Sequence, residues 1–449
     1  KHKLVRHINL SLSRCLRGES RRMFLNKIFT MKLFSAVTLC FFYAGISAQN
    51  TYIPDDSFEQ YLIWMELDDV LNDSVLTENI VDVQALFLSY SSINDLTGLE
   101  GFSSLDTLSL SELQNSEISY LDMSVVPGLK YLDCYNQNGQ IDSINLSQNL
   151  DLQFLDASGN TLTQLDLSNN PVLENLRINF NQLSEIDLSN NSFLKDIWIN
   201  NNNLISLDLG NNNMLENLGV NLNQLSEIDL SNKPNLINVY CEENNILVLD
   251  INNAPLLSSL RCSGNQISEL DVLNKPNLEQ LFAGNNLLSS LDLSSCGSLV
   301  WIWLNSNQLF ELNVANGLNT YMGPSPGGGL YHIPDFTDNP NLTCITVDDV
   351  AHCTEWWNTE GYPIFGNPNG YVAIDSTMYF SSDCASVSVD ELSSESVLIY
   401  PNPATNHITV DLNSLEELNG VLKIYDLSGR LVLEKLANQV ATIDVSYLV

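Results

Sequence analysis

The chain has 449 residues, of which 54 are Asp or Glu and 18 are Lys or Arg, giving a formal net charge of −36 at pH 7. A surface of this sign disfavours nucleic acid and anionic membranes as partners, whereas it favours solubility and divalent cations. Only 16% of the residues are charged, and Asn, Leu and Ser crowd the middle of the chain, which is typical of a repeat protein.

The first 48 residues indicate segments that precede the mature protein. Residues 1–30 are basic and lack a starting Met, so we interpret them as spurious upstream translation. Residues 31–48 have a charged start, an apolar run and small residues before a cut after Ala48, as a secretory signal peptide does. The apolar run is shorter than the ~20 residues that a membrane anchor needs, so no membrane span is expected after cleavage. Removing these residues, with nine of the basic and one of the acidic side chains, leaves a net charge of −44.

Residues 49–82 are expected to form an N-terminal cap, because a stack of repeats exposes apolar side chains at its ends. Asp55, Asp56 or Ser57 can cap a helix. The apolar residues that share one face of that helix are Phe58, Tyr61, Leu62 and Met65.

Residues 83–347 repeat with a period of 21. An asparagine recurs at this interval through eight units: Asn160, Asn181, Asn202, Asn223, Asn244, Asn265, Asn286 and Asn307. Apolar residues keep fixed places around each one, as Leu176 and Ile178 do before Asn181. One unit cannot bury so many Leu, so the units must stack and share a core. We expect about 11–12 coils, with looser units first and a last coil at "LTCITV".

The pattern L-x-x-L-x-L-x-x-N-x-L, as in "LENLRINFNQL", resembles the leucine-rich repeats, and the 21-residue period with "LDLS" resembles the internalin-type repeats of bacterial surface proteins. This resemblance implies a leucine-rich-repeat solenoid, a curved stack of β-rich coils. Around it we expect a helical N-terminal cap, an irregular C-terminal cap at residues 348–385 and a small β-sandwich tail.

The eight asparagines are predicted to be structural. A buried amide at a sharp turn must hydrogen-bond backbone groups of its own and the neighbouring coil. A second asparagine column is expected to mark the opposite corner of each coil: Asn169, Asn190, Asn211, Asn232, Asn253, Asn274 and Asn316.

Seven cysteines remain after signal cleavage. Cys241 and Cys262 occupy the same place in successive units, so we interpret them as inert core thiols. Cys344 with Cys384 is the preferred disulfide of the C-terminal cap, which leaves Cys353 unpaired, although sequence does not fix the connectivity.

Residues 386–396 form a Ser-rich acidic linker. The "YPNPA" turn followed by "IYDLSGRLV" resembles the C-terminal sorting domain of proteins exported by the type IX secretion system of the Bacteroidota, over residues 397–449. The resemblance implies contact with the secretion machinery and a location outside the cell or on the outer-membrane surface. The family pattern ordinarily continues past "IDVSYLV", so a truncated sorting domain is expected.

Residues interleaved with the L-x-L strand would line the open inner face of the solenoid. That column is rich in aromatic residues and Arg and lies beside a column of amides, which suits a protein or glycan ligand. The candidate binding residues are Arg177, Trp198, Tyr240, Arg261, Phe282, Trp301 and Trp303. The alternative is that these rings only shield the sheet.

An aspartate column recurs six residues after each ladder asparagine: Asp166, Asp187, Asp208, Asp229, Asp250, Asp271 and Asp292. Like charges on adjacent coils repel, so something must offset them. Hydrogen bonds from Ser or backbone N–H groups are the plain explanation, and a column of bound Ca²⁺ is the alternative. No other cofactor or metal site is expected.

Catalytic motifs are lacking: the sequence has no glycine-rich phosphate loop, no H-E-x-x-H and no nucleophile elbow, so we predict that the chain is not an enzyme. The expected function is a secreted or cell-surface recognition and adhesion protein. The alternatives are a passive structural or spacer protein of the cell envelope and a non-catalytic accessory subunit for polymer capture.

Overall fold

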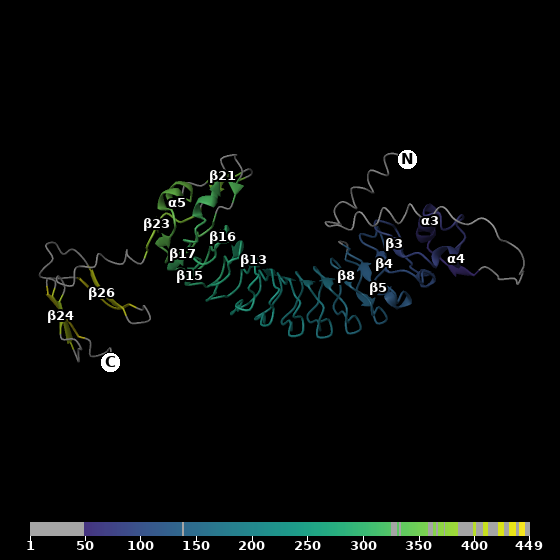
Figure 1. The fold of residues 1–449 in the computed structure, drawn as a ribbon, viewed down its shortest axis with the longest axis horizontal. Coiled ribbons are helices and arrows are strands. Elements are labelled where there is room, and N and C mark those ends of the chain that lie inside the picture. Colours follow the sequence, from purple (N-terminus) through teal and green to yellow (C-terminus); the bar gives the residue numbers. More distant parts are fainter. Residues whose placement is uncertain are drawn as a thin grey trace, which may run out of the picture. The chain divides into compact units, whose positions relative to one another are not determined.

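The structure is a computed structural model that describes most of the chain from residue 49 onward (Figure 1). The described residues are 49–136, 139–324, 330–331, 334–357, 362–364, 367–371, 373–384 and five strands of the tail. Residues 1–30, the expected signal peptide at 31–48 and the linker at 386–396 lie outside them. Contacts divide the chain into Lys1–Gln49 and Asn50–Val449, and the helices and strands described here belong to the second unit.

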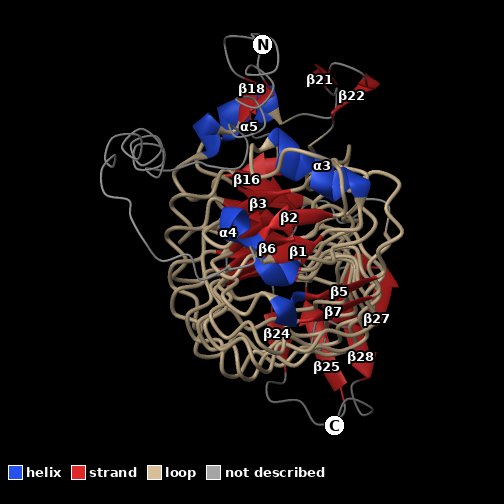
Figure 2. Cartoon of the chain, turned by 90° about the vertical axis from the view of Figure 1, so that its right-hand side faces the viewer, coloured by secondary structure: helices blue, strands red, loops and turns tan. Residues whose placement is uncertain are grey.

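The N-terminal cap covers the first coil of the stack, as the view along the stack shows (Figure 2). Its elements are β1 (Asn50–Tyr52), α3 (Asp56–Trp64), β2 (Ser74–Leu76) and α4 (Thr77–Ile80). Asp55 caps α3, because its Oδ1 accepts the backbone N–H groups of Ser57 and Phe58, both at 2.9 Å. Phe58 packs on Phe102 from the repeats, with ring centroids 6.1 Å apart. The expectation for Met65 was wrong: it is 41% exposed, because the helix ends at Trp64.

The coils align eleven short parallel strands in one sheet. Three residues form each strand, and the middle one is buried in the shared core because strand side chains alternate between the two faces. The strands are β3 (Ala85–Phe87), β4 (Thr107–Ser109), β6 (Tyr131–Asp133), β8 (Phe154–Asp156), β9 (Asn175–Arg177), β10 (Asp196–Trp198), β11 (Asn217–Gly219), β12 (Asn238–Tyr240), β13 (Ser259–Arg261), β14 (Gln280–Phe282) and β16 (Trp301–Trp303). First and third residues therefore face away from the core.

Shorter pairings form on the second half of some coils. The parallel sheet of β15 (Ser290–Asp292), β17 (Glu311–Asn313), β20 (Cys344–Thr346) and β23 (Tyr379–Ser381) lies at the late end, and β5 (Tyr120–Asp122) pairs with β7 (Ser143–Asn145). Two 3₁₀ turns, Leu99–Gly101 and Met123–Val125, complete the early coils. The expectation for "LTCITV" needs correction: it forms β20, the second half of a coil whose first half begins at Asp335, which bridges to Trp303.

The asparagine ladder holds every coil to the next. For all eight predicted residues, the side-chain Oδ1 accepts a backbone N–H of the preceding coil at 3.0–3.2 Å, and Nδ2 donates to buried carbonyls. The residue before the ladder position takes a left-handed conformation, with φ of 53–57° at non-glycine positions such as Phe180 and Leu222. Sequence analysis missed a ninth member, Asn339, which bonds Leu309 in the same way.

In most coils the second asparagine column lies one residue later than expected. Six of the seven predicted members, such as Asn190 and Asn211, are exposed. The seventh, Asn316, is buried at the predicted position and donates through Nδ2 to the Cys296 and Leu299 carbonyls. One residue later in the earlier coils, buried asparagines donate through Nδ2 to carbonyls of the preceding coil: Asn149, Asn170, Asn191 and Asn212. In later coils buried Lys233 and Lys275 take this place.

The C-terminal cap is irregular, as expected. Its predicted range, 348–385, contains the helix α5 (Val350–Trp356) and the antiparallel pair of β21 (Tyr362–Ile364) with β22 (Asn367–Tyr371). The 3₁₀ turn Asn319–Tyr321 and the antiparallel pair of β18 (Gly323–Pro324) with β19 (Leu330–Tyr331) come earlier, within the range predicted for the repeats. Trp357 is buried, contacts Phe336 and Phe380, and donates through Nε1 to the Met322 carbonyl at 3.0 Å. A disulfide joins Cys344 to Cys384, the pair that sequence analysis preferred, and Cys353 is a buried free thiol.

The described residues of the tail form five antiparallel strands in two sheets. One sheet has β24 (Leu398–Tyr400), β25 (His407–Asp411) and β28 (Val440–Asp444), and the other has β26 (Val421–Tyr425) and β27 (Leu431–Leu436).

Candidate functional site

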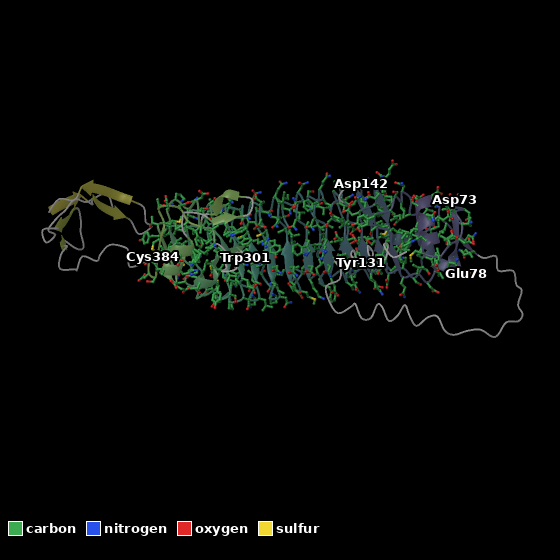
Figure 3. All side chains as sticks on the ribbon, turned by 90° about the horizontal axis from the view of Figure 1, so that it is seen from above. Asp73, Glu78, Tyr131, Asp142, Trp301 and Cys384 are labelled. Atoms are coloured by element: carbon green, nitrogen blue, oxygen red, sulfur yellow. A yellow bond between two sulfur atoms is a disulfide. The ribbon has the colours of Figure 1, made fainter. Side chains whose placement is uncertain are left out.

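The outward side of the eleven-stranded sheet, called the sheet face here, consists of three columns of side chains. The first and third residues of each strand supply two columns, and the residue two places after each strand supplies the third. In-register parallel pairing places equivalent residues side by side on neighbouring strands. Tyr131 and Trp301 belong to the same column, at well-separated positions along the stack (Figure 3).

An aromatic stack lies at the early end of the sheet face. The rings of Tyr131 and Phe154 are parallel, with centroids 4.2 Å apart and planes within 5°. Arg177 places its guanidinium over the Phe154 ring, 5.5 Å from the centroid. The predicted binding residues included Arg177, and Trp301 from the first column, but not Tyr131 and Phe154. The signal for these two was an aromatic residue directly before "LD" in the adjacent strands β6 and β8.

A longer stack covers the late end. The Arg261 guanidinium lies between two rings, 5.0 Å from the Tyr240 centroid and 4.8 Å from that of Phe282. Phe282 in turn stacks on Trp303, with centroids 4.2 Å apart and planes at 11°. Arg261 also donates to the side-chain oxygen of Gln280 at 3.1 Å. A cation held between two rings is attracted by both quadrupoles, so these contacts stabilise the arrangement of Arg261 and the two rings.

The predicted binding residues differ in the exposed fraction of their side chains. Trp303 is 38% exposed, but Phe282 is only 6% exposed because Arg261 and Trp303 cover its two sides. The expectation that Phe282 is open to a ligand was therefore wrong. Its role in the structure is to hold its neighbours in place.

Trp198 lies between the two stacks, beside a strand position that has no side chain. A Cβ atom at Gly219 would lie 2.4 Å from Cε3 of the Trp198 ring, so the indole occupies the space above that glycine. The ring reaches past Gly219 toward Tyr240, with centroids 5.7 Å apart and planes at 49°.

Amide side chains flank the aromatic residues on both sides. In the third column, Asn200 donates to Asn179 at 2.8 Å and accepts the backbone N–H of Asn221 at 2.7 Å. In the first column, Asn238 donates to Asn217 at 2.6 Å, and Asn217 donates to Asp196. These bonds fix the amides in place along the sheet.

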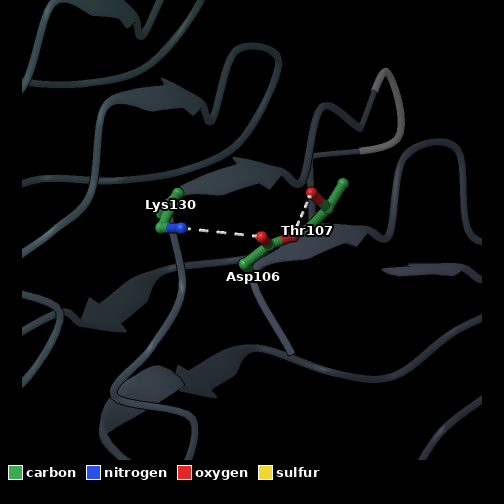
Figure 4. Close-up of polar contacts among 3 residues, drawn as sticks. All are labelled: Asp106, Thr107 and Lys130. Atoms are coloured by element: carbon green, nitrogen blue, oxygen red, sulfur yellow. Dashed lines mark hydrogen bonds and ion pairs between the residues drawn. The ribbon is translucent and has the colours of Figure 1, made fainter. Parts of the chain in front are cut away.

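The sheet face carries acidic side chains whose pKa values are shifted by their surroundings. Burial, and then the neighbouring Asp133, raise the pKa of Asp156, although bonds from Ser158 act in the opposite direction. Burial also raises the pKa of Glu242, against the lowering effect of Arg261. At the edge of this face, Lys130 pairs with Asp106 at 3.7 Å, and Asp106 accepts a bond from Thr107, the first residue of β4 (Figure 4). This pair is half-exposed and contributes little to stability.

The aspartate column lies on exposed positions, as expected. Each carboxylate accepts the backbone N–H two residues later at 2.8–3.0 Å, from Asp166 through Asp292. A Ser hydroxyl bond, followed by the backbone bond, lowers the pKa of Asp166, Asp187 and Asp229. Local hydrogen bonds therefore offset the repulsion between coils.

The free cysteines are buried, and burial raises their thiol pKa values. The pKa of Cys262 and of Cys353 rises to about 12, and that of Cys296 to about 11. Thiols that do not ionise near neutral pH are poor nucleophiles and metal ligands, which agrees with a packing role.

One acidic group in the described part of the chain has the spacing of a cation site. Carboxylate oxygens of Asp56, Glu59 and Asp73 lie within 4.8 Å of one another in the N-terminal cap. Glu59 is fully buried, and its oxygens already accept backbone N–H groups of the 72–74 turn at 2.9–3.1 Å. The geometry gives Glu59 a structural role in closing the cap.

His352 contacts a backbone carbonyl and an aromatic ring. Its Nε2 lies 3.1 Å from the Met322 carbonyl, beside the Trp356 ring, within the C-terminal cap. His332 falls outside the described residues. Within the described part of the chain, every helix is too short or too polar to cross a membrane.

Comparison with known proteins identifies the tail. Residues 398–449 match the family of secretion system C-terminal sorting domains. None of the curated proteins matches the chain.

Solved repeat proteins resemble the stack of coils. An internalin (inlF) from Listeria monocytogenes str. 4b F2365 is 20% identical over 67% of this chain and 92% of its own, with a TM-score of 0.48. The functional domain of InlJ from Listeria monocytogenes, described as including a cysteine ladder, is 22% identical over 58% of this chain and 77% of its own, with a TM-score of 0.35. YopM from Yersinia enterocolitica WA-314 is 25% identical over 59% of this chain and 50% of its own, with a TM-score of 0.42.

The fold assignment rests on the molecule itself. Parallel strands in register, a 21-residue period and a continuous asparagine ladder define a leucine-rich-repeat solenoid. The tail domain directs export by type IX secretion. The chain is thus a leucine-rich-repeat protein with a secretion sorting domain, exported to the cell surface or the extracellular space.

Proposed function

We propose that this protein is a recognition or adhesion protein that binds a protein or glycan ligand through the sheet face. The observation that carries the proposal is the row of side chains from Trp198 to Trp303. Trp198 reaches across Gly219 of β11 to Tyr240, and from Tyr240 onward each side chain contacts the next on the following strand. Aromatic residues and Arg dominate the energetics of binding surfaces, because they bury a large area with few rotatable bonds.

Preorganisation supports this proposal. The row is fixed by ring stacking, by the Arg261 bond to Gln280 and by the flanking amide ladders. A surface that is already ordered loses little conformational entropy on binding. Trp198 and Trp303 are the anchors that a ligand can reach. Arg177 and Tyr240 lie beside Trp198, and Arg261 lies over Phe282, the ring on which Trp303 stacks.

The second candidate is a passive spacer of the cell envelope, or an accessory subunit that captures polymer without catalysis. The burial of Phe282 favours the spacer, since stacked rings that cover one another stabilise the sheet without a ligand. The exposed Trp303 ring and the partly exposed Trp198 ring, whose ring contact with Tyr240 is tilted rather than stacked, favour recognition. Ca²⁺ remains an alternative partner of the aspartate column, and the local hydrogen bonds argue against it.

The test is binding of the full chain to arrays of glycans and surface proteins, beside a Trp198→Ala/Trp303→Ala double variant. A Trp64→Ala variant is the matched control, because Trp64 is 57% exposed on α3 of the cap rather than on the sheet face. The proposal expects a saturable ligand that the double variant loses and the control retains, with unchanged thermal midpoints. Silence from the parent protein would favour the spacer.

A further inference from the structure

The aromatic side chains of the sheet face differ in how much ring surface is left uncovered. Phe154 is covered by Tyr131 on one side and Arg177 on the other. Phe282 is likewise enclosed between Arg261 and Trp303. A ring whose two sides are occupied has no flat surface to offer a ligand.

Trp198 is different. Arg177, its neighbour on β9, turns away and lies over Phe154, and Arg261 lies over Tyr240. Among the described residues, the ring contact of Trp198 is the tilted one with Tyr240, at 49°. Because Gly219 has no side chain, the indole extends over β11 instead of being pushed outward by a neighbour.

Amides on both sides of this ring retain hydrogen-bonding capacity. Each side-chain amide has two N–H donors and an oxygen with two lone pairs. The bonds described for Asn200 and for Asn217 use one donor and one lone pair in each. Each therefore has a further N–H and a lone pair for a ligand that lies on Trp198.

The charges around this site disfavour polyanions. Asp196 is the first-column residue of the Trp198 strand, and Glu242 is the third-column residue two places after β12 ends at Tyr240. Arg177 and Arg261, the nearest cations of the row, are held over rings. Lys195, directly before β10, is paired with Glu174 at 2.6 Å, and the carboxylates of Asp196 and Glu242 would repel a polyanion here.

We propose that the part of the sheet face over β10, β11 and β12 binds an uncharged polysaccharide. This proposal rests on the proposed recognition function and names its ligand class. A pyranose ring presents an apolar C–H face and a rim of hydroxyl groups. The C–H face stacks on the Trp198 indole, and the hydroxyls exchange hydrogen bonds with Asn200 and Asn217. Gly219 sets the specificity, because it makes room for the ring.

The test is affinity electrophoresis of the full chain in gels that contain a neutral β-glucan, a neutral mannan or polyanionic alginate. We expect retardation by a neutral polymer and none by alginate. Trp198→Ala and Gly219→Ala should each weaken that binding by about tenfold or more, since both remove the ring from its place. Trp64→Ala should bind like the parent, and the thermal midpoint of each variant checks its folding.

Four outcomes would overturn the inference. Equal binding by the parent and both variants would place any glycan site elsewhere. Stronger retardation by alginate would refute the charge argument. A protein ligand that is lost in Trp198→Ala/Trp303→Ala, with no neutral glycan bound, would leave the recognition function standing and this ligand class refuted. Absence of binding to every glycan and protein would refute both.

Discussion

Replacement of Asn223 by Leu tests whether the ladder asparagines hold the coils together. Asn223 Nδ2 donates to the carbonyls of Ile199 and Val220 at 2.9 and 3.1 Å, and its Oδ1 accepts the Leu204 N–H at 3.0 Å. Both carbonyls keep a second donor from the ladder members of adjacent coils. The Leu204 N–H is therefore the group that loses its described partner, in a fully buried site.

An orphaned buried donor costs roughly 1–3 kcal/mol, so we expect a loss of about 2 kcal/mol in the free energy of unfolding. The assay is urea unfolding followed by circular dichroism, with hydrogen exchange at the Leu204 amide, which should exchange about 30-fold faster. Asn190→Leu is the control, because Asn190 is exposed. Unchanged unfolding and unchanged protection of Leu204 would refute the account.

Further predictions concern the cap, the acids and the thiols. Reduction of Cys344–Cys384, which are 40 residues apart, should destabilise the cap by roughly 4 kcal/mol on the chain-entropy account, measured by urea unfolding with and without reductant. Asp156→Asn should stabilise the protein at pH 7 and have no effect in acid, measured by urea unfolding at both pH values. Ca²⁺ and chelator should give equal thermal midpoints, because the aspartate column is already hydrogen-bonded. Free thiols should react with a disulfide reagent only in denaturant.

The sign of the Asp156 effect follows from its raised pKa. Above both the folded and the unfolded pKa, the ionised carboxylate is less favourable in the folded state, so it lowers stability. That penalty disappears as the pH falls through the folded pKa. Asn keeps the Oδ1 that accepts the Ser158 N–H at 3.0 Å. A variant that is less stable than the parent at pH 7 would contradict this reasoning.

Periodic features were predictable from the sequence, because repetition removes ambiguity. The ladder asparagines and the buried Leu positions recur at one spacing, so eight units independently support the same assignment. Residue type narrowed the cap of α3 to Asp55, Asp56 or Ser57, and the structure selects Asp55. The second asparagine column could not be placed from the sequence. Consecutive asparagines such as Asn190 and Asn191 both fit the spacing, and only the backbone path at the turn determines which of the two side chains is buried.

The sequence predicted which residues lie on the sheet face, but not which of their side chains contact one another. The period placed Arg177 and Trp198 on the same face, yet it did not reveal that Arg177 turns toward Phe154. Nor did it show that Phe282 is enclosed, because side-chain direction depends on which neighbours are large. Gly219 has no side chain to contribute to the column, and its position makes room for the Trp198 indole, which the period does not show.

The long coil between Asn307 and Asn339 indicates how such a protein can diversify in evolution. Asn339 lies 32 residues after Asn307, eleven more than the period, yet it makes the ladder bonds to Leu309 and Leu304 at 3.1 and 3.0 Å. Loop-closure entropy rises slowly with length, so the extra residues cost little. An evolving lineage can therefore lengthen the periphery of one coil, or duplicate a whole coil, and explore new partners while the ladder and core stay as they were.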